Sequence, residues 1–251
     1  MKQNQIKTEE EIKIMKRSGQ ICAKALKKVL NNVKPGVTCL SLDAIAREEI
    51  EKRGATSSFM TVEGYKYTIC TTINEQVVHG IPTGRKLKEG DILSIDIGAL
   101  YNGYHSDLAI TVPVGKVSKD TQAFIDTGMQ TLKAALKQVK VGNYIGDISE
   151  SIQKGIENSG YSIVKSLTGH GVGTTLHEDP MVPGHGKKET GPQIKKNMTL
   201  AVEVIYTNGS GEVGVEKDNW TITASDGTLG GLFEQTVAVK RSGPIVLTPY
   251  L

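Results

Sequence analysis

Apolar residues recur at helical spacing in four segments, which lie in two pairs along the chain. The first pair covers residues 8–30, opened by a T-x-x-E capping box, and about 38–53, where a glycine follows. The second pair covers about 118–139 and about 145–158. The pattern therefore predicts two pairs of helices, with apolar segments of strand character after each pair.

The segment 91–114, DILSIDIGALYNGYHSDLAITVPV, predicts a β-hairpin that turns at Asn102-Gly103, because a type I′ turn needs positive φ at both central positions. This turn makes Asp96 and Asp107 diagonal neighbours on one face, with about 7 Å or less between their Cβ atoms. Two ionised carboxylates that close in apolar surroundings repel each other. Either one is protonated, or a cation lies between them, or the hairpin is an edge whose acids face solvent.

The chain also repeats itself. Residues 33–54 align without gaps on residues 139–160, and they share Val, Lys, Gly, Ile, Glu and Gly in register. At nearly the same offset, LKEGDILSIDIG lies over IKKNMTLAVEVI, which places Asp96 over Glu203. Two matches in the same structural context predict an internal duplication, and they make an accidental exposed acid a poor explanation of Asp96.

The duplication predicts an α+β fold with an antiparallel sheet covered by two pairs of helices. The repeats would span about 8–114 and 118–242 within one domain, residues 1–251. Joining the two halves through their sheets relates Asp96 and Glu203 by a pseudo-two-fold axis. The carboxylate inside an apolar strand is then a repeated feature.

Composition narrows the class of protein. Of 251 residues 23% are charged, and the net charge of +3 requires neither a nucleic-acid nor a membrane partner. No run approaches the roughly 18 apolar residues of a membrane span, and the N-terminus lacks an apolar signal core. Cys22, Cys39 and Cys70 fit no close CxxC spacing, which predicts a protein of the reducing cytosol.

Two lysine doublets, Lys187-Lys188 and Lys195-Lys196, are the main clusters of positive charge. We interpret them as solvated loop positions. A patch that faces the ribosome is the alternative.

Further acids and histidines stand among apolar or glycine-rich residues. Glu203 lies in TLAVEVIYT, Glu234 in GGLFEQTVAVK, and His170 and His177 in SLTGHGVGTTLHEDPMVPGHG. Taken singly, a strand Glu usually faces solvent and a His is usually structural. The GxGxG around His170 is not a dinucleotide loop, because prolines follow it instead of an amphipathic helix. The glycines instead predict a backbone that bends around His170.

Together these residues form a candidate metal centre. It consists of four carboxylates and one imidazole, from Asp96, Asp107, His170, Glu203 and Glu234. Four buried carboxylates carry a charge of −4, which two divalent cations with bridging carboxylates would cancel. Oxygen-rich ligation with one nitrogen suits Mn²⁺, Fe²⁺, Co²⁺ or Zn²⁺.

The order Asp, Asp, His, Glu, Glu, with gaps of 11, 63, 33 and 31 residues, resembles the type I methionine aminopeptidases of the pita-bread fold. The supporting motifs are TINEQVVHGIP, SIDIG, GYHSD, GHGVGTTLHEDPMVPG, VEV and FEQT. The resemblance extends over the whole chain, without the helical insertion of the type II enzymes and without an amino-terminal extension. It implies a cytoplasmic, monomeric exopeptidase that removes the N-terminal methionine of new proteins whose second residue is small.

The resemblance also implies roles for the five ligands around two divalent ions, of Co, Mn, Fe or Zn. Asp107 and Glu234 would bridge the ions, Asp96 would chelate one, and His170 would complete the other. Glu203 would also move the proton as general base and acid. The substrate's free α-amine would bind a metal, which restricts cleavage to chain ends.

Outside the metal centre, His79 and His177 match the family's two histidines that are not ligands, and they would donate hydrogen bonds to the substrate amide and the developing oxyanion. His105 and His185 match no catalytic position, and we expect them to be exposed. The methionine side chain would enter an apolar pocket. The pocket would be formed by Tyr65, Cys70 and Trp220, with Phe59 and Leu176 adjacent.

Three positions depart from the family pattern: Val62 replaces a pocket tyrosine, Val204 a proline and Gln235 a histidine. None of these is a ligand, so they bear on pocket shape and methionine preference rather than on hydrolysis. Two alternatives remain, a proline-specific peptidase of the same fold and a module that has lost its metals and only binds peptides. The first usually carries an additional amino-terminal domain, and the second typically loses ligands, all of which are kept here.

Overall fold

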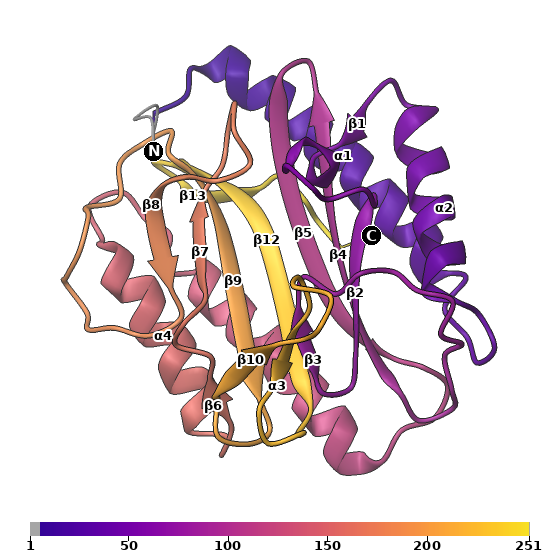
Figure 1. Cartoon of the computed structure of the whole chain (residues 1–251). Coiled ribbons are helices and arrows are strands. Elements are labelled where there is room, and N and C mark those ends of the chain that lie inside the picture. Colours follow the sequence, from indigo (N-terminus) through magenta and orange to yellow (C-terminus); the bar gives the residue numbers. More distant parts are fainter. Residues whose placement is uncertain (1–5, 251) are drawn as a thin grey trace.

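The computed structural model describes residues 6–250, and it confirms the four predicted helices and the α+β class (Figure 1). The helices are α1 (Glu9–Leu30), α2 (Cys39–Glu51), α3 (Lys119–Leu136) and α4 (Ile145–Glu157). A short 3₁₀ turn, η1 (Phe59–Thr61), follows α2. No helix within residues 6–250 is long and apolar enough to cross a membrane.

The strands form one large antiparallel sheet and one small one. The large sheet has the order β1-β4-β5-β12-β9-β7-β8, with β2 paired to β4, β6 to β9 and β13 to β12. Its strands are β1 (Thr56–Ser57), β2 (Ile69–Ile73), β4 (Ile92–Tyr101), β5 (Tyr104–Pro113), β6 (Ser162–Ile163), β7 (Thr168–Gly171), β8 (Glu178–Pro183), β9 (Thr199–Thr207), β12 (Gly230–Lys240) and β13 (Gly243–Val246). The small sheet joins β10 (Val213–Val215), β11 (Ile222–Ala224) and β3 (Gln76–Val78).

Local sequence explains where the first helix begins. The Thr8 hydroxyl accepts from the Glu11 N–H at 3.2 Å, and the Glu11 carboxylate accepts from the Thr8 N–H at 2.6 Å. This is the predicted capping box, which satisfies two N–H groups that the helix itself leaves unpaired. The predicted boundaries of α2 and α3 extend two or three residues too far at the C-terminal end, where the last turn gives way to a loop.

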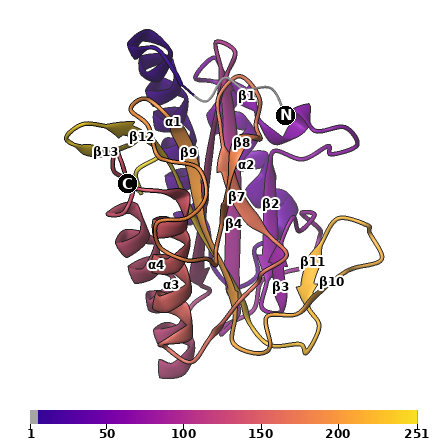
Figure 2. The same ribbon diagram turned by 90° about the vertical axis from the view of Figure 1, so that its left-hand side faces the viewer.

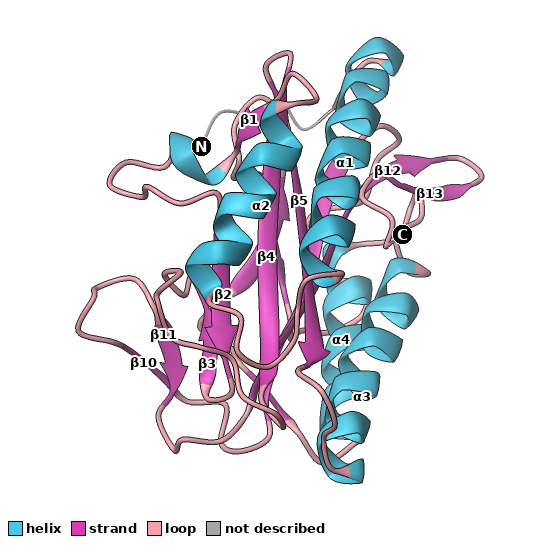
Figure 3. Ribbon diagram, turned by 90° about the vertical axis from the view of Figure 1, so that its right-hand side faces the viewer, coloured by secondary structure: helices cyan, strands magenta, loops and turns pink. Residues whose placement is uncertain are grey.

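Side-chain alternation divides the large sheet into a helix-covered face and an open face. On β4, Ile95 and Ile97 pack beneath α1 and α2, while Asp96 points the other way. On β9, Val202 and Val204 pack beneath α3 and α4, while Glu203 points the other way. Figures 2 and 3 show α1, α3 and α4 on one side of the large sheet, with β3, β10 and β11 on the other side. The candidate ligands therefore lie on the face that the helices leave free.

Candidate metal centre and adjoining pocket

Strand register places three of the acids in one row across the large sheet. Asp96 on β4 is paired with Ala109 on β5, which is paired with Glu234 on β12. Glu234 is in turn paired with Glu203 on β9. Directly paired residues point to the same face, so Asp96, Glu234 and Glu203 project together from three strands.

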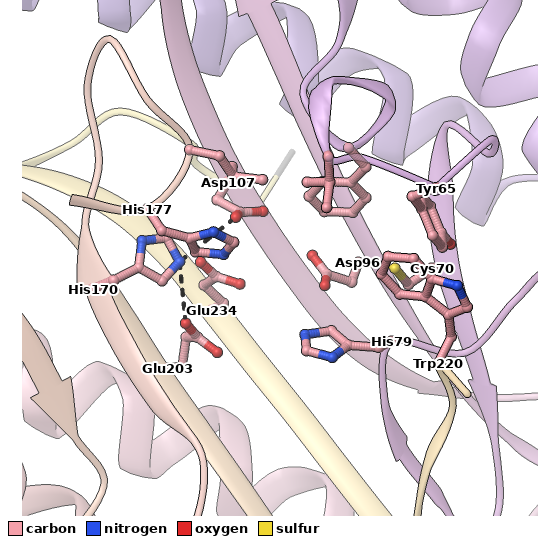
Figure 4. A pocket seen from close by; sticks show the side chains of 13 residues that line it. Tyr65, Cys70, His79, Asp96, Asp107, His170, His177, Glu203, Trp220 and Glu234 are labelled. Carbon is pink, nitrogen blue, oxygen red and sulfur yellow. Dashed lines mark ion pairs between the residues drawn. The ribbon is translucent and has the colours of Figure 1, made fainter. Parts of the chain in front are cut away.

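The other two candidates join this row diagonally. Asp107 lies opposite Gly98, as the Asn102-Gly103 turn predicts. His170 on β7 is paired with Ala201, two residues before Glu203 and therefore on the same face. All five predicted ligands thus converge on one point of the open face (Figure 4). The edge-hairpin alternative is wrong, because β12 covers the far side of β5 and Asp107 is only 4% exposed.

The carboxylates lie in an environment that penalises their charge. Burial raises the pKa of Asp96 to about 7. Burial, followed by repulsion from neighbouring carboxylates, raises the pKa of Asp107 and Glu234 well above the ordinary range. Burial and the charge of Asp96 do the same to Glu203. Without a compensating cation the site favours protonated acids.

A backbone contact fixes the orientation of the imidazole of His170. Its Nδ1–H donates to the Gly171 carbonyl at 2.8 Å, which leaves the lone pair of Nε2 directed at the acids. Nε2 lies 3.5 Å from Glu203 Oε1 and 3.9 Å from Asp107 Oδ2. Burial lowers the pKa of His170 to about 3, so the ring is neutral. The Nε2 lone pair of His170 and the carboxyl oxygens of Glu203 and Asp107 therefore face one another, an arrangement that suits a shared cation.

This donor set fits a divalent cation. One donor atom each from Asp107, His170 and Glu234 lies within 4.8 Å of the others. Within the described chain, Asp96 Oδ1 and Glu234 Oε1 are buried and have no hydrogen-bond partner. Buried carboxylate oxygens without partners are costly, and cation coordination satisfies them. Four carboxylates with one imidazole form a hard, oxygen-rich set.

The glycines beside His170 allow strands to approach closely. A Cβ at Gly169 would lie 2.5 Å from the Ala201 carbonyl oxygen, and one at Gly171 would lie 2.2 Å from the Asp179 carbonyl oxygen. The pairing of β7 with β8 is irregular between these glycines. The predicted bend at His170 is thus a local irregularity of β7, held between β8 and β9.

His79 and His177 reach the same cavity from two loops. His79 follows β3 with φ of 58°, in the left-handed region that a non-glycine residue seldom adopts. His177 precedes β8, and its ring centroid lies 4.5 Å from that of His170, because the two histidines are not on one regular strand. Burial lowers the pKa of both His79 and His177, so each is a neutral ring with one N–H to donate. Figure 4 shows the acids between these two histidines.

An apolar pocket continues directly from the acids, in a cavity of about 190 Å³ that both sets line. The pairing of Cys70 on β2 with Asp96 on β4 places one wall beside the predicted ligands. The rings of Tyr65 and Trp220 meet edge to face at 5.1 Å. The apolar cluster consists of Phe59, Tyr65, Cys70 and Leu176, with Val62 and Trp220 packed against it. The predicted pocket residues therefore come together.

The expectation for the remaining histidines is wrong. His105 is 4% exposed, its Nδ1 lies 2.9 Å from the Ser58 hydroxyl, and burial lowers its pKa to about 4. It points from β5 to the open face, where loops cover it. His185 is also partly buried rather than exposed.

Sequence reasoning also missed two buried charges. Lys7 and Glu178 form an ion pair, with exposures of 2% and 3%. Lys7 stands in a charged segment that looks exposed, and Glu178 stands beside His177 as one more polar loop residue. The only sequence signal was the position of Glu178 directly after a candidate site histidine.

Known proteins are similar to this chain in sequence and in fold. The profile of metallopeptidase family M24 matches residues 13–241. Methionine aminopeptidase 1 of Bacillus subtilis is 42% identical over 242 residues, which are 96% of this chain and 98% of that protein. The crystal structure of methionine aminopeptidase from Thermotoga maritima has a TM-score of 0.95 and 38% identity, covering 97% of this chain and 98% of that one.

A prolidase from Pyrococcus furiosus shares the fold with a TM-score of 0.80, at 23% identity, over 98% of this chain and 65% of its own. The methionine aminopeptidases thus match at higher identity and along their whole length. The pita-bread fold predicted from the sequence is confirmed. The chain belongs to metallopeptidase family M24 and, within it, to the methionine aminopeptidases.

Proposed function

We propose that this chain removes the N-terminal methionine from peptides by metal-assisted hydrolysis. The observation that carries the proposal is the continuity of the site. Five donor side chains line one cavity, three of them buried and within 4.8 Å of one another, and an apolar pocket opens beside them in the same cavity. A scissile peptide bond at the acids would place the preceding side chain in that pocket.

We propose two divalent ions, of Co, Mn, Fe or Zn, because two charges of +2 balance four carboxylates. Asp96, Asp107, His170, Glu203 and Glu234 would hold them, with Asp107 and Glu234 shared. When bound, such ions act as Lewis acids and lower the pKa of coordinated water towards neutrality.

The chain's own side chains would handle protons and orientation. Glu203 lies beside His170 Nε2 and would accept a proton from the attacking water and return it to the leaving amine. His79 and His177 each have a ring N–H to donate, and they would bind the substrate amide and the developing oxyanion.

Phe59, Tyr65, Cys70, Leu176 and Trp220 would bind the methionine side chain. A thioether packs well against aromatic edges, and the edge-to-face ring pair of Tyr65 and Trp220 offers such edges. Val62 lines this pocket, so its departure from the family pattern affects pocket shape. Val204 faces the helices and Gln235 donates to the Thr248 carbonyl, so neither departure reaches the cavity.

The preference for a small second residue has support on the other side of the acids. A second cavity of about 170 Å³ adjoins His79, Asp96 and Glu203. Its other walls include Ser166, Leu167 and Thr168. A residue after the scissile bond would enter this limited space, which favours a small side chain.

We further propose a monomeric, single-domain enzyme of the cytoplasm that acts on new proteins, with no membrane or specific nucleic-acid partner. Lys187, Lys188, Lys195 and Lys196 are candidates for a ribosome contact. A proline-specific peptidase is less well supported, since the matched prolidase is 23% identical to this chain whereas the two methionine aminopeptidases above are 42% and 38% identical. A binding module is less well supported because all five donors are present.

A peptide panel tests the proposal. Metal-stripped protein would be incubated with Met-Ala-Ser, Met-Pro and Ala-Pro peptides, each with Mn²⁺, Fe²⁺, Co²⁺ or Zn²⁺. Release of free methionine from Met-Ala-Ser, dependent on metal, is the expected result. Cleavage of Ala-Pro would indicate the proline-specific peptidase, and cleavage of none would indicate the binding module.

A further inference from the structure

A buried ion pair fixes the loop that carries two residues of the proposed site. This loop, residues 172–177, joins β7 to β8 and contains Leu176 of the apolar pocket and His177. Residue Glu178 follows at once, and its two carboxylate oxygens serve different partners. Oε1 accepts from the Thr175 N–H at 3.2 Å and the Thr174 hydroxyl at 3.3 Å, whereas Oε2 contacts the Lys7 ammonium.

Lys7 comes from a distant part of the chain, just before α1. Its backbone N–H donates to the Asn197 carbonyl at 2.9 Å, in the turn that leads into β9. Thr8, the next residue, caps α1. The Lys7 backbone is therefore anchored on both sides, and its side chain reaches the loop from a fixed origin.

Close packing shows that the Lys7 side chain lies directly against the loop. A Cβ added at Gly173 would lie 2.5 Å from Lys7 Cε and 2.6 Å from Glu178 Oε1. The Gly173 carbonyl accepts from the His105 N–H at 2.8 Å, which ties the loop to β5 as well. The loop is thus held by two contacts, one with Lys7 and one with His105 near the start of β5.

A buried ion pair is weak support for stability, because desolvation of both charges offsets their attraction. The contacts of this pair instead point to a geometric role, because Glu178 joins Lys7 to Thr174 and Thr175 of the loop that carries His177. We propose that Lys7 and Glu178 are positioning residues that hold His177 and Leu176 in place for the reaction. This inference rests on the proposed function, and neither Lys7 nor Glu178 is assigned to the substrate or to the metals.

The test compares Lys7→Met, Glu178→Gln and the double variant by kcat, KM, bound metal and Tm. Lys13→Met is the matched control, since Lys13 pairs with Glu10 on the exposed side of α1. Lys7→Met should lower kcat by roughly tenfold to a hundredfold, because a misplacement of about 1 Å costs that much in rate. Bound metal should stay at the wild-type level, and Lys13→Met should match the wild type throughout.

The double variant separates positioning from stability. It leaves no unpaired buried charge, so its Tm should recover towards the wild-type value even if each single variant folds poorly. Its kcat should remain low, because the link to the loop is gone. Recovery of kcat together with Tm would overturn the proposal.

A mutant cycle with His177→Ala shows whether the effect passes through this histidine. In the His177→Ala background, Lys7→Met should change kcat by less than about twofold, because residues that act as a unit are not additive. If Lys7→Met lowers kcat by the same factor with His177 and with His177→Ala, the proposal is overturned. Failure of the wild-type protein to release methionine would instead refute the proposed function, which keeps the two outcomes distinct.

Discussion

Replacement of a ligand by a neutral isostere should stabilise the metal-free protein, and Asp96→Asn is the sharpest case. Burial raises the pKa of Asp96 from 3.8 to about 7 in the folded protein. One pKa unit corresponds to about 1.4 kcal/mol, so about three units give roughly 4 kcal/mol. Because the folded-state pKa is the higher one, Asp96 lowers the free energy of unfolding progressively as pH rises from about 4 to about 7.

Urea unfolding in chelator, at intervals from pH 4 to pH 8, measures this difference. The free energy of unfolding of Asp96→Asn should equal that of the wild type near pH 4 and exceed it by about 4 kcal/mol at pH 8. The buried histidines titrate in both proteins. Loss of the Asp96 charge also relieves the repulsion that raises the pKa of Asp107, Glu203 and Glu234, which acts in the same direction. With divalent metal present the wild type should have the higher free energy of unfolding, since metal binding stabilises the protein that keeps all its ligands.

Asp226→Asn is the matched control. Asp226 is exposed, and hydrogen bonds from Thr228 and Ser210 lower its pKa. The ionised Asp226 therefore stabilises the folded protein, the opposite of Asp96. Asp226→Asn should be less stable than the wild type at neutral pH. An Asp96→Asn difference that stays flat between pH 4 and pH 8 would refute the claim that Asp96 is buried among other acids.

Two further predictions concern β7 and the loop after it. His170→Ala should lose bound metal and activity together, whereas His177→Ala should keep its metal and lose roughly 10² to 10³ in kcat; equal loss of metal in both would make His177 a ligand. Gly169→Ala places a Cβ 2.5 Å from the Ala201 carbonyl oxygen, so it should destabilise the fold by about 1–3 kcal/mol and lower Tm. Gly84 has open space around it, so the control variant Gly84→Ala should leave Tm unchanged.

Local signals in the sequence were enough for the helices and the central hairpin. The capping box at Thr8 and the helical spacing placed α1, and Asn102-Gly103 fixed the register that sets Gly98 opposite Asp107. Register in turn fixed which face carries Asp96. Turn chemistry and periodicity act over a few residues, so a single sequence can display them.

Long-range contacts were not visible in the same way. Glu178 and Lys7 are 171 residues apart, and each looks like an ordinary exposed charge until the fold joins them. His105 lies on the open face of β5, and its burial depends on loops that approach from elsewhere. The small sheet of β3, β10 and β11 has strands of three residues, too short for a pattern of alternation.

We propose that divalent metal at the five converging side chains enables methionine release. The most direct measurement is a titration of metal-stripped protein with Mn²⁺, in which bound metal and free methionine from Met-Ala-Ser are measured on the same samples. We expect no release without metal, and release that rises with bound metal until two ions per chain are present. Undiminished release from the stripped protein would contradict it.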